Sequence, residues 1–250
     1  MEKWFRKIAV ITGASTCIGQ QLIKDLSHAG LTVIGISRKK HIIDGLAHKT
    51  KSSTTGKIIG IECDISNENA IKNTFKNIEN EFGGLHIMIN NAGRIRKGET
   101  LNGKTVRDEE LISTINFSLT GVVWCTREAY KLMQKMNEHA YIINVNGLVG
   151  TLIGEDKVRY ANIYCATKYA VKNHTETVRL DLANANNRMI RVTSINPGCV
   201  QIKDKSRKSN ENLMPALNPK DVSNTILYLL STPPEINITE LTIKSTGFPL

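Results

Sequence analysis

Residues 8–19 read IAVITGASTCIG, and this stretch indicates the fold of the whole chain. A short apolar run ends at Thr12, and two glycines, Gly13 and Gly19, bracket the residues that follow. A strand that leads through such a turn into a helix offers backbone N–H groups and the positive end of the helix dipole to a pyrophosphate. Glycine allows a close backbone approach that side chains would block. We therefore expect a dinucleotide-binding turn at the start of an α/β fold.

The rest of the chain continues this pattern. Short β-branched runs alternate with longer amphipathic segments, which is typical of a parallel sheet covered by helices on both faces. We expect strands over residues 8–12, 32–37, 57–62, 86–90, 140–144, 191–196 and 238–244, and the longest helices over 108–135 and 160–185. No linker, repeat or low-complexity stretch interrupts the sequence. The prediction is one domain over residues 1–250, a Rossmann-type doubly wound sheet of about seven parallel strands.

Composition narrows the class of protein. A chain of 250 residues with 40% hydrophobic and 22% charged residues is typical of a soluble globular domain that needs no metal or disulfide to fold. No apolar run has the length of a membrane span, and the first residues do not resemble a signal peptide. The five cysteines are scattered without the spacing of a metal site, so we expect free thiols in the cytoplasm and no bound metal.

The formal net charge of +10 raises the question of an acidic partner. The basic residues are spread along the chain in small clusters that lack stacking aromatics or a groove-reading motif. We therefore expect a solvated basic surface and no nucleic acid. The cluster that begins with Arg38, Lys39 and Lys40 is the exception considered below.

A second motif, a tyrosine followed four residues later by a lysine, is relevant to proton transfer. Tyr164 and Lys168 are four residues apart, so a helix places both on one face. This spacing is common on helices and means little alone. Five further segments occur in order, namely residues 12–19, Asp64-Ile65, Asn90-Asn91-Ala92-Gly93, Asn116 and Asn196-Pro197-Gly198. Together they resemble the short-chain dehydrogenase/reductase family across essentially the whole chain, and residues 217–222 and 228–233 resemble its insect farnesol dehydrogenase-like subgroup.

The resemblance implies a set of cofactor contacts. In the family pattern Asp64 would bond the adenine amine, Ile65 would pack on the adenine ring, and Asn90 is treated as structural. The remaining implied contacts are Gly13, Ser15, Thr16, Cys17, Ile18 and Gly19 in the turn, Asn91, Ala92 and Gly93 after the fourth strand, and Pro197, Gly198 and Val200 beside the nicotinamide. Cys17 replaces a glycine and Ile202 a threonine that the family usually carries.

The residues after the second strand indicate which cofactor is used. An acidic residue there would bond the ribose hydroxyls of NAD, whereas an arginine accommodates the 2′-phosphate of NADP. The chain offers Arg38 and Lys39 and no carboxylate, so we expect NADP(H). The alternative is that Arg38 only caps a surface turn.

For the chemistry, Tyr164 would exchange a proton with the substrate oxygen, and Lys168 would act as the cation that lowers the tyrosine pKa. By resemblance Lys168 also holds the nicotinamide ribose, and Asn116 anchors a water relay. Asn116 could equally serve as a helix-kink residue.

One expected group is missing. Residues 142–150 read IINVNGLVG, and the family pattern puts Gly147 where a catalytic serine belongs. Asn146 or Thr151 could substitute if the loop is rearranged, although Asn146 would point to the opposite face of a regular strand. Residues 203–216, which would cover the substrate, are short and strongly polar.

These observations leave two hypotheses. The first is an NADP(H)-dependent oxidoreductase that interconverts an alcohol and a carbonyl on a small apolar substrate such as a terpenoid or steroid, weakened by the loss of the serine. The second is an NADP-binding pseudoenzyme that acts as a sensor or scaffold. In either case we expect a homodimer or homotetramer formed through the long helices, whose apolar residues include Val122, Val123, Thr126 and Tyr130.

Overall fold

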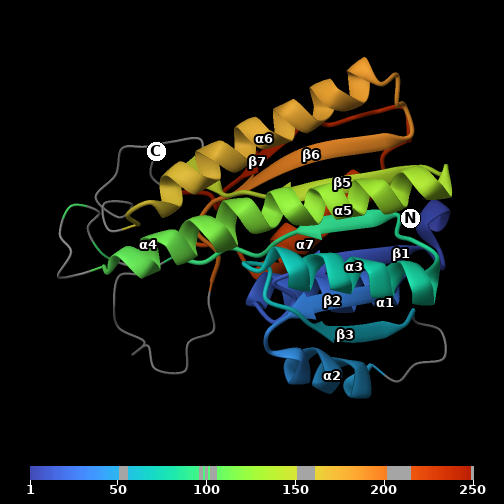
Figure 1. Cartoon of the computed structure of the whole chain (residues 1–250), viewed down its shortest axis with the longest axis horizontal. Helices are drawn as coiled ribbons and strands as arrows, with labels where there is room; N and C mark the ends of the chain where they lie inside the picture. The colour runs from blue at the N-terminus through green and yellow to red at the C-terminus, as the bar shows by residue number, and fades with distance from the viewer. Residues whose placement is uncertain are drawn as a thin grey trace.

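A seven-stranded parallel sheet forms the centre of the computed structural model, which describes residues 1–50, 56–95, 98, 101, 106–150, 161–201 and 215–248 (Figure 1). The strand order is β3-β2-β1-β4-β5-β6-β7. The strands are β1 (Ile8–Thr12), β2 (Thr32–Ser37), β3 (Ile58–Glu62), β4 (Ile87–Asn90), β5 (Ala140–Val145), β6 (Ile190–Pro197) and β7 (Glu240–Ile243). The predicted sheet is confirmed, and β1 and β2 have the predicted bounds.

The order of the strands determines where a ligand-binding crevice is expected. The chain builds outward from β1 through β2 to β3, then returns to the other side of β1 for β4 and continues to β7. The point between β1 and β4 is therefore the topological switch, where a crevice opens at the carboxyl ends of the strands. The two residues that follow β1 and β4, Gly13 and Asn91, lie on either side of it.

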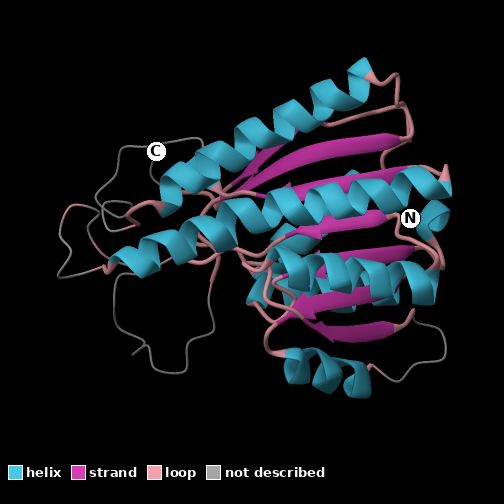
Figure 2. Cartoon of the chain, in the orientation of Figure 1, coloured by secondary structure: helices cyan, strands magenta, loops and turns pink. Residues whose placement is uncertain are grey.

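Helices cover both faces of the sheet (Figure 2). On one face α1 (Cys17–His28) packs against α7 (Pro219–Ser231), and α2 (Lys40–Lys49) lies beside β2 and β3. On the other face lie α3 (Glu68–Phe82), α5 (Gly121–Met136) and α6 (Tyr164–Asn184). Successive strand residues alternate between the two cores: Ala9 and Ile11 face α1 and α7, whereas Val10 faces α3 and α5.

The helix predicted over residues 108–135 is present, with an interruption of its regular geometry. It consists of α4 (Asp108–Ile115), a π-helical turn η2 (Asn116–Thr120) and α5. Single π turns inside α-helices are frequent at functional sites. This turn packs against α6, so Asn116 lies in the segment that faces the helix of Tyr164 and Lys168.

Two of the four residues predicted to form a subunit interface are buried in the core of the protein. Val122 and Thr126 are each 2% exposed, and Thr126 accepts a hydrogen bond from the Asn90 amide. Both residues face the sheet because the inward face of α5 supplies the core, so they are not available to a second subunit. Val123 and Tyr130 are half-buried.

The structure also shows the state of the cysteines. All five cysteines are free thiols, as predicted. Within the described residues, none of the helices combines the length and the apolar character needed to cross a membrane. The same part of the chain holds no group of three or more potential metal ligands. Two short 3-10 turns, η1 (Glu2–Trp4) and η3 (Leu148–Gly150), complete the elements.

Candidate active site

The turn after β1 has the geometry that the sequence predicts. Gly13 has a φ of 63°, and a Cβ there would lie 2.8 Å from the Ala92 Cα atom. A Cβ on Gly19 would lie 2.3 Å from the Gly13 carbonyl oxygen. Glycine is thus required at both positions for steric reasons. Thr16 caps α1 by accepting a hydrogen bond from the Gly19 N–H at 3.2 Å, which leaves Cys17 and Ile18 as the first residues of the helix.

Asn91 ties this turn to the end of β4. Its side-chain amide donates to the carbonyl oxygens of Thr12 and Gly13 at 3.1 Å each, and to the Thr16 hydroxyl at 3.2 Å. The Ala92 N–H in turn donates to the Thr12 hydroxyl at 3.2 Å. These bonds hold the two sides of the switch-point crevice together. Beside them the Ser15 and Ser37 hydroxyls are 2.7 Å apart and link the turn to the end of β2.

Arg38 lies at the carboxyl end of β2, where the cofactor preference was predicted to be set. Its Nη1 atom is 3.6 Å from the Asp64 carboxylate, and its guanidinium lies 5.5 Å from the centre of the Phe117 ring. Burial disfavours the charge on Asp64, but hydrogen bonds from Ser66 and the nearby Arg38 and Arg94 outweigh it and lower the Asp64 pKa. The side chain of Arg38 is half exposed, so it remains accessible to a ligand.

Of four neighbouring residues, Lys39 is exposed and the other three are buried. Lys39 precedes α2, and its N–H donates to the Ser37 hydroxyl at 3.0 Å. Ile65 and Ala92 are only 3% and 1% exposed and belong to the core beneath the crevice. Asn90 is structural, as predicted, because its amide donates to the Asn144 side chain on the adjacent strand at 2.8 Å.

Tyr164 and Lys168 lie in the first turns of α6 and face the loop after β4. A Cβ on Gly93 would lie 3.3 Å from both the Tyr164 hydroxyl oxygen and the Lys168 Nζ atom. The Lys168 ammonium donates to the Val145 carbonyl oxygen at the end of β5 at 3.0 Å. The predicted pair is therefore assembled at the carboxyl ends of β4 and β5, beside the switch point.

Burial dominates the electrostatics of this pair. It raises the pKa of Tyr164, with a smaller contribution from Cys165, and it lowers the pKa of Lys168 to about 8. The predicted lowering of the Tyr164 pKa by Lys168 therefore does not offset the effect of burial. The Lys168 Nζ atom lies 5.5 Å from the centre of the Tyr164 ring and bonds a backbone carbonyl instead of the phenol.

Asn116 begins the π-helical turn, and its side chain has no hydrogen-bond partner within the described residues. The alternative reading of Asn116 as a kink residue thus agrees with its position. Ser118 in the same turn is a positioning residue that the sequence motifs did not indicate. Its buried hydroxyl accepts a hydrogen bond from the Arg94 N–H at 3.3 Å and so positions the loop after β4.

Gly147 is placed at the end of β5 with a φ of 127°. The nearest atoms to a Cβ built there are the Val149 Cγ2 atom at 3.8 Å and the Pro197 carbonyl oxygen at 3.9 Å. There is room for a side chain, but the backbone conformation is one that favours glycine. Position 147 lacks a side-chain donor, and the local backbone has adapted to the glycine.

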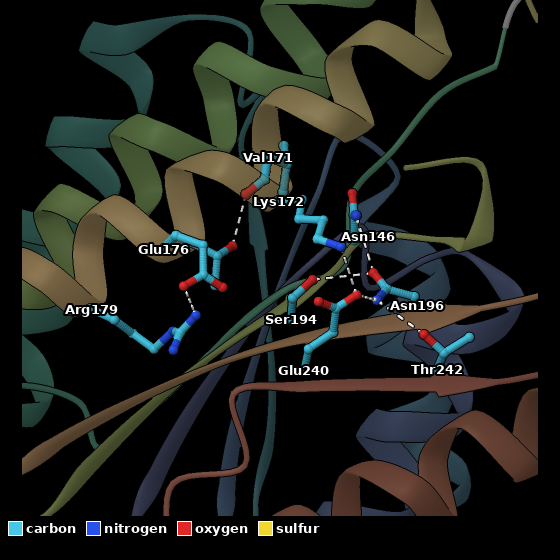
Figure 3. A network of polar contacts seen from close by, with 10 residues as sticks. Asn146, Val171, Lys172, Glu176, Arg179, Ser194, Asn196, Glu240 and Thr242 are labelled. Atoms are coloured by element: carbon cyan, nitrogen blue, oxygen red, sulfur yellow. Dashed lines mark hydrogen bonds and ion pairs between the residues drawn. The ribbon is translucent and has the colours of Figure 1, made fainter. Parts of the chain in front are cut away.

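Asn146 does not fill the gap. It is 3% exposed, and its amide donates to the Asn196 side chain at 3.1 Å (Figure 3). Asn196 donates in turn to Glu240 at 2.6 Å, and Lys172 of α6 pairs with Glu240 at 3.0 Å. Asn146 thus belongs to a polar network that joins β5, β6, β7 and α6. The other candidate, Thr151, and the positions Ile202 and 203–214 lie outside the described residues.

The loop after β6 lies at the carboxyl ends of the strands, on the same edge of the sheet as the turns after β1 and β4. The Gly198 N–H donates to the Ile243 carbonyl oxygen at 2.8 Å, which holds Pro197 and Gly198 against β7. Val200 pairs with Leu217 in an isolated bridge. Cys199 is exposed.

A dinucleotide fits this arrangement on two structural grounds. The turn at Gly13 and Gly19 is a backbone cradle that any Cβ would fill, and it lies at the N-terminus of a helix of twelve residues. Lys168 is 2% exposed, yet within the described residues only one acceptor, the Val145 carbonyl, meets its three N–H donors. Unused donors on a buried ammonium are expected where a polar ligand binds.

Comparison with known proteins agrees with this fold. The family model described as short chain dehydrogenase matches residues 7–213. The chain belongs to the short-chain dehydrogenase family, whose members are oxidoreductases that bind a nicotinamide cofactor.

Relatives within the family are similar over their full length. The chain is 36% identical over 250 residues to farnesol dehydrogenase of Aedes aegypti, with 99% of each chain covered. It is 34% identical over 257 residues to dehydrogenase/reductase SDR family member 11 of Mus musculus, covering 98% of this chain and 96% of that protein. The predicted resemblance to farnesol dehydrogenase-like relatives is confirmed.

Solved structures share the fold. An alcohol dehydrogenase from Thermococcus sibiricus, complexed with 5-hydroxy-NADP, superposes with a TM-score of 0.82 at 21% identity and covers 98% of both chains. The closed form of a serine dehydrogenase complexed with NADP+ gives 0.80 at 25% identity and covers 94% of both chains.

Proposed function

We propose that this protein is an NADP(H)-dependent oxidoreductase that interconverts an alcohol and a carbonyl on a small apolar substrate. One observation carries the proposal: the Tyr164 hydroxyl and the Lys168 ammonium converge beside Gly93 at the carboxyl ends of β4 and β5. The apolar substrate class is supported by the similarity to farnesol dehydrogenase over the whole chain.

The residues of the crevice have separate roles in this proposal. The turn at residues 13–19 would bind the pyrophosphate, Arg38 and Lys39 the 2′-phosphate, and Lys168 the ribose next to the nicotinamide. The remaining implied contacts, Asp64, Ile65, Asn91, Ala92, Gly93, Pro197, Gly198 and Val200, line the same edge of the sheet. A bound nicotinamide cofactor supplies or accepts the hydride.

Tyr164 would transfer the proton to or from the substrate oxygen. Its raised pKa keeps the phenol protonated at neutral pH, so it is ready to donate to a carbonyl oxygen that is becoming an alkoxide. The positive charge of Lys168 beside it favours the anionic oxygen that forms during the step. Asn116 would complete a water-mediated connection to the lysine. Because Gly147 provides no second donor, we propose reduced turnover, by about 10² to 10³ on the scale of one lost donor.

The preference for NADP(H) rests on Arg38. NADPH should bind more tightly than NADH, and Arg38→Asp should reverse the order by removing the cation and adding a carboxylate. Titration of each cofactor by fluorescence measures both affinities. Lys49→Gln, an exposed lysine at the end of α2, serves as the matched control for a lost charge and should change neither. Equal affinities for the two cofactors in the unmodified protein would refute the assignment.

The activity itself is tested by following NADPH absorbance with a panel of aldehydes, ketones and terpenoid and steroid carbonyls. We expect slow turnover on an apolar carbonyl, and a loss of about 10² or more in Tyr164→Phe. Tight NADPH binding without turnover on any substrate would favour the NADP-binding pseudoenzyme, the function that the missing donor at Gly147 suggests. Failure to bind either cofactor would refute both.

A further inference from the structure

A pocket of about 310 Å³ lies at the opposite edge of the sheet from the candidate active site. Its walls come from the segments that lead into three strands of the sheet: Lys7 precedes β1, Glu138 precedes β5, and Met189 precedes β6. In Figure 1 this edge lies on the side of the N label. None of the residues that line the pocket contributes to the cofactor crevice.

Cations predominate among the side chains that line this pocket, which we call the amino-edge pocket. Lys3, Lys7 and Arg191 are the lysines and arginines of the lining, and Glu138 is the one carboxylate among the lining residues. Lys7 forms an ion pair with Glu138. The lining therefore carries a formal excess of two positive charges.

Arg191 is the most unusual of these groups because it is only 5% exposed. Its Nη1 atom donates to the Thr232 hydroxyl at 2.8 Å and to the carbonyl oxygens of Pro233 and Ile236 at 3.1 and 2.8 Å. Its guanidinium stacks 4.1 Å from the centre of the Tyr141 ring. No carboxylate of the described residues lies within ion-pair distance of it. A buried charge without a counter-ion is costly, and most such charges are paired.

Arg191 also acts electrostatically on its neighbour Lys3. Burial lowers the pKa of Lys3, and the neighbouring Arg191 lowers it further, while Glu235 opposes this only in part. Burial likewise lowers the pKa of Arg191, and Tyr141 and Glu235 oppose this only in part. An anion placed between Lys3 and Arg191 would relieve this repulsion.

The pocket also has an apolar side. Trp4 is 2% exposed and fixed by a hydrogen bond from its indole N–H to the Leu230 carbonyl oxygen at 2.8 Å, and Met189 lies beside it in the lining. An aromatic ring and a thioether offer contact to an apolar group but no countercharge. The ligand that fits is therefore an anion with an apolar portion.

We propose that the amino-edge pocket binds a small organic anion of the class of aryl phosphate monoesters. The dianionic phosphate balances the two excess charges and bonds Lys3 and the free donors of Arg191. The aryl group packs against Trp4 and Met189. This site is independent of the cofactor crevice and of the function proposed above.

The test is a calorimetric titration with phenyl phosphate at fixed ionic strength. We expect saturable binding that is tighter than the binding of inorganic phosphate, which has only the anionic part, or of benzyl alcohol, which has only the aromatic part. Lys3→Gln should weaken it by about two- to fivefold, on the scale of one exposed charge contact. Glu138→Gln should strengthen it by a similar factor because it removes the opposing carboxylate and frees Lys7. Opposite effects of these two variants cannot arise from a general loss of stability, which thermal unfolding monitors in parallel.

Two matched variants locate the site. Lys49→Gln changes the net charge as Lys3→Gln does, and Arg38→Gln removes a cation from the cofactor crevice, so both should leave the affinity for phenyl phosphate unchanged. Loss of binding in Arg38→Gln would assign the anion to the cofactor crevice and overturn the proposal. The absence of binding, equal affinity for inorganic phosphate, or indifference to both Lys3→Gln and Glu138→Gln would overturn it as well.

Discussion

Gly147 has no side chain that could donate to a substrate oxygen, and its backbone has a φ of 127°. The space around the missing Cβ is open, so the obstacle to restoring a serine is conformational rather than steric. A side chain at this position is therefore expected to lower stability, because L residues rarely adopt a positive φ.

Gly147→Ala and Gly147→Ser form a matched pair at this residue. Both should lower the free energy of unfolding by about 1 to 3 kcal/mol, because both place a Cβ in a sparsely populated backbone region. Only the serine adds a donor, so its turnover should exceed that of the alanine variant by up to about a hundredfold. Tyr164→Phe in the serine background should remove the gain. Urea denaturation and NADPH consumption measure the two effects, and equal turnover of the alanine and serine variants would contradict the assignment of position 147.

Lys168 provides a pH dependence of stability. The unfolded chain keeps the lysine proton up to its ordinary pKa of 10.5, whereas the folded protein releases it from about pH 8. Between these values the unfolded state binds more protons, so the contribution of Lys168 to the free energy of unfolding rises with pH, by up to about 3 kcal/mol. Below about pH 8 both states are protonated and the full cost of burying the charge remains.

The comparison with Lys168→Met isolates this effect. Urea denaturation of the cofactor-free proteins from about pH 7 to about pH 10 should show the wild type gaining stability relative to the variant. The raised pKa of Tyr164 acts in the opposite direction only above pH 10 and is common to both proteins. Parallel pH profiles of the two proteins would show that the amine is not buried as a charged group.

At the scale of elements, α1 and α2 contain two helical glycines in contrasting environments. A Cβ on Gly19, in the first turn of α1, would meet the Gly13 carbonyl oxygen at 2.3 Å, whereas a Cβ on Gly45 of α2 would meet nothing within 4 Å. Gly19→Ala should therefore displace the turn and weaken cofactor binding at least tenfold. Gly45→Ala should bind the cofactor normally and gain up to about 1 kcal/mol from its helix propensity. Cofactor titration and thermal unfolding of both variants test this, and equal cofactor affinity would mean that the turn does not hold the cofactor.

At the scale of the whole molecule, α4 and η2 pack against α6 on one layer, as Figure 1 shows. Ile112 on α4 and Leu180 on α6 are 57% and 64% exposed, so this layer presents apolar side chains other than the buried Val122 and Thr126. We still expect a homodimer or homotetramer, since exposed apolar side chains of this size favour association. Leu180→Glu should shift light scattering toward the monomer, and Phe5→Glu at the opposite edge should not. A monomeric wild type at micromolar concentration would refute the prediction.

The sequence by itself determined the strands, the order of the helices, the glycine turn and the pairing of Tyr164 with Lys168. Each of these depends on local chemistry: a period of two or 3.6 residues, a steric need for glycine, and a four-residue spacing on one helix face. The assignment of Gly147 to the position of the missing serine came from the family resemblance, which aligns the residues after the fifth strand.

Only the tertiary structure decided what surrounds these residues. The φ of Gly147, the turn of Asn146 toward Asn196, the ion pair of Arg38 with Asp64 and the raised pKa of Tyr164 all depend on contacts between segments far apart in the chain. The amino-edge pocket is the clearest case, since Lys3 and Arg191 meet only after the sheet has brought β1 and β6 into one layer. Burial and electrostatic fields are properties of that packing, and a linear pattern of residue types does not contain them.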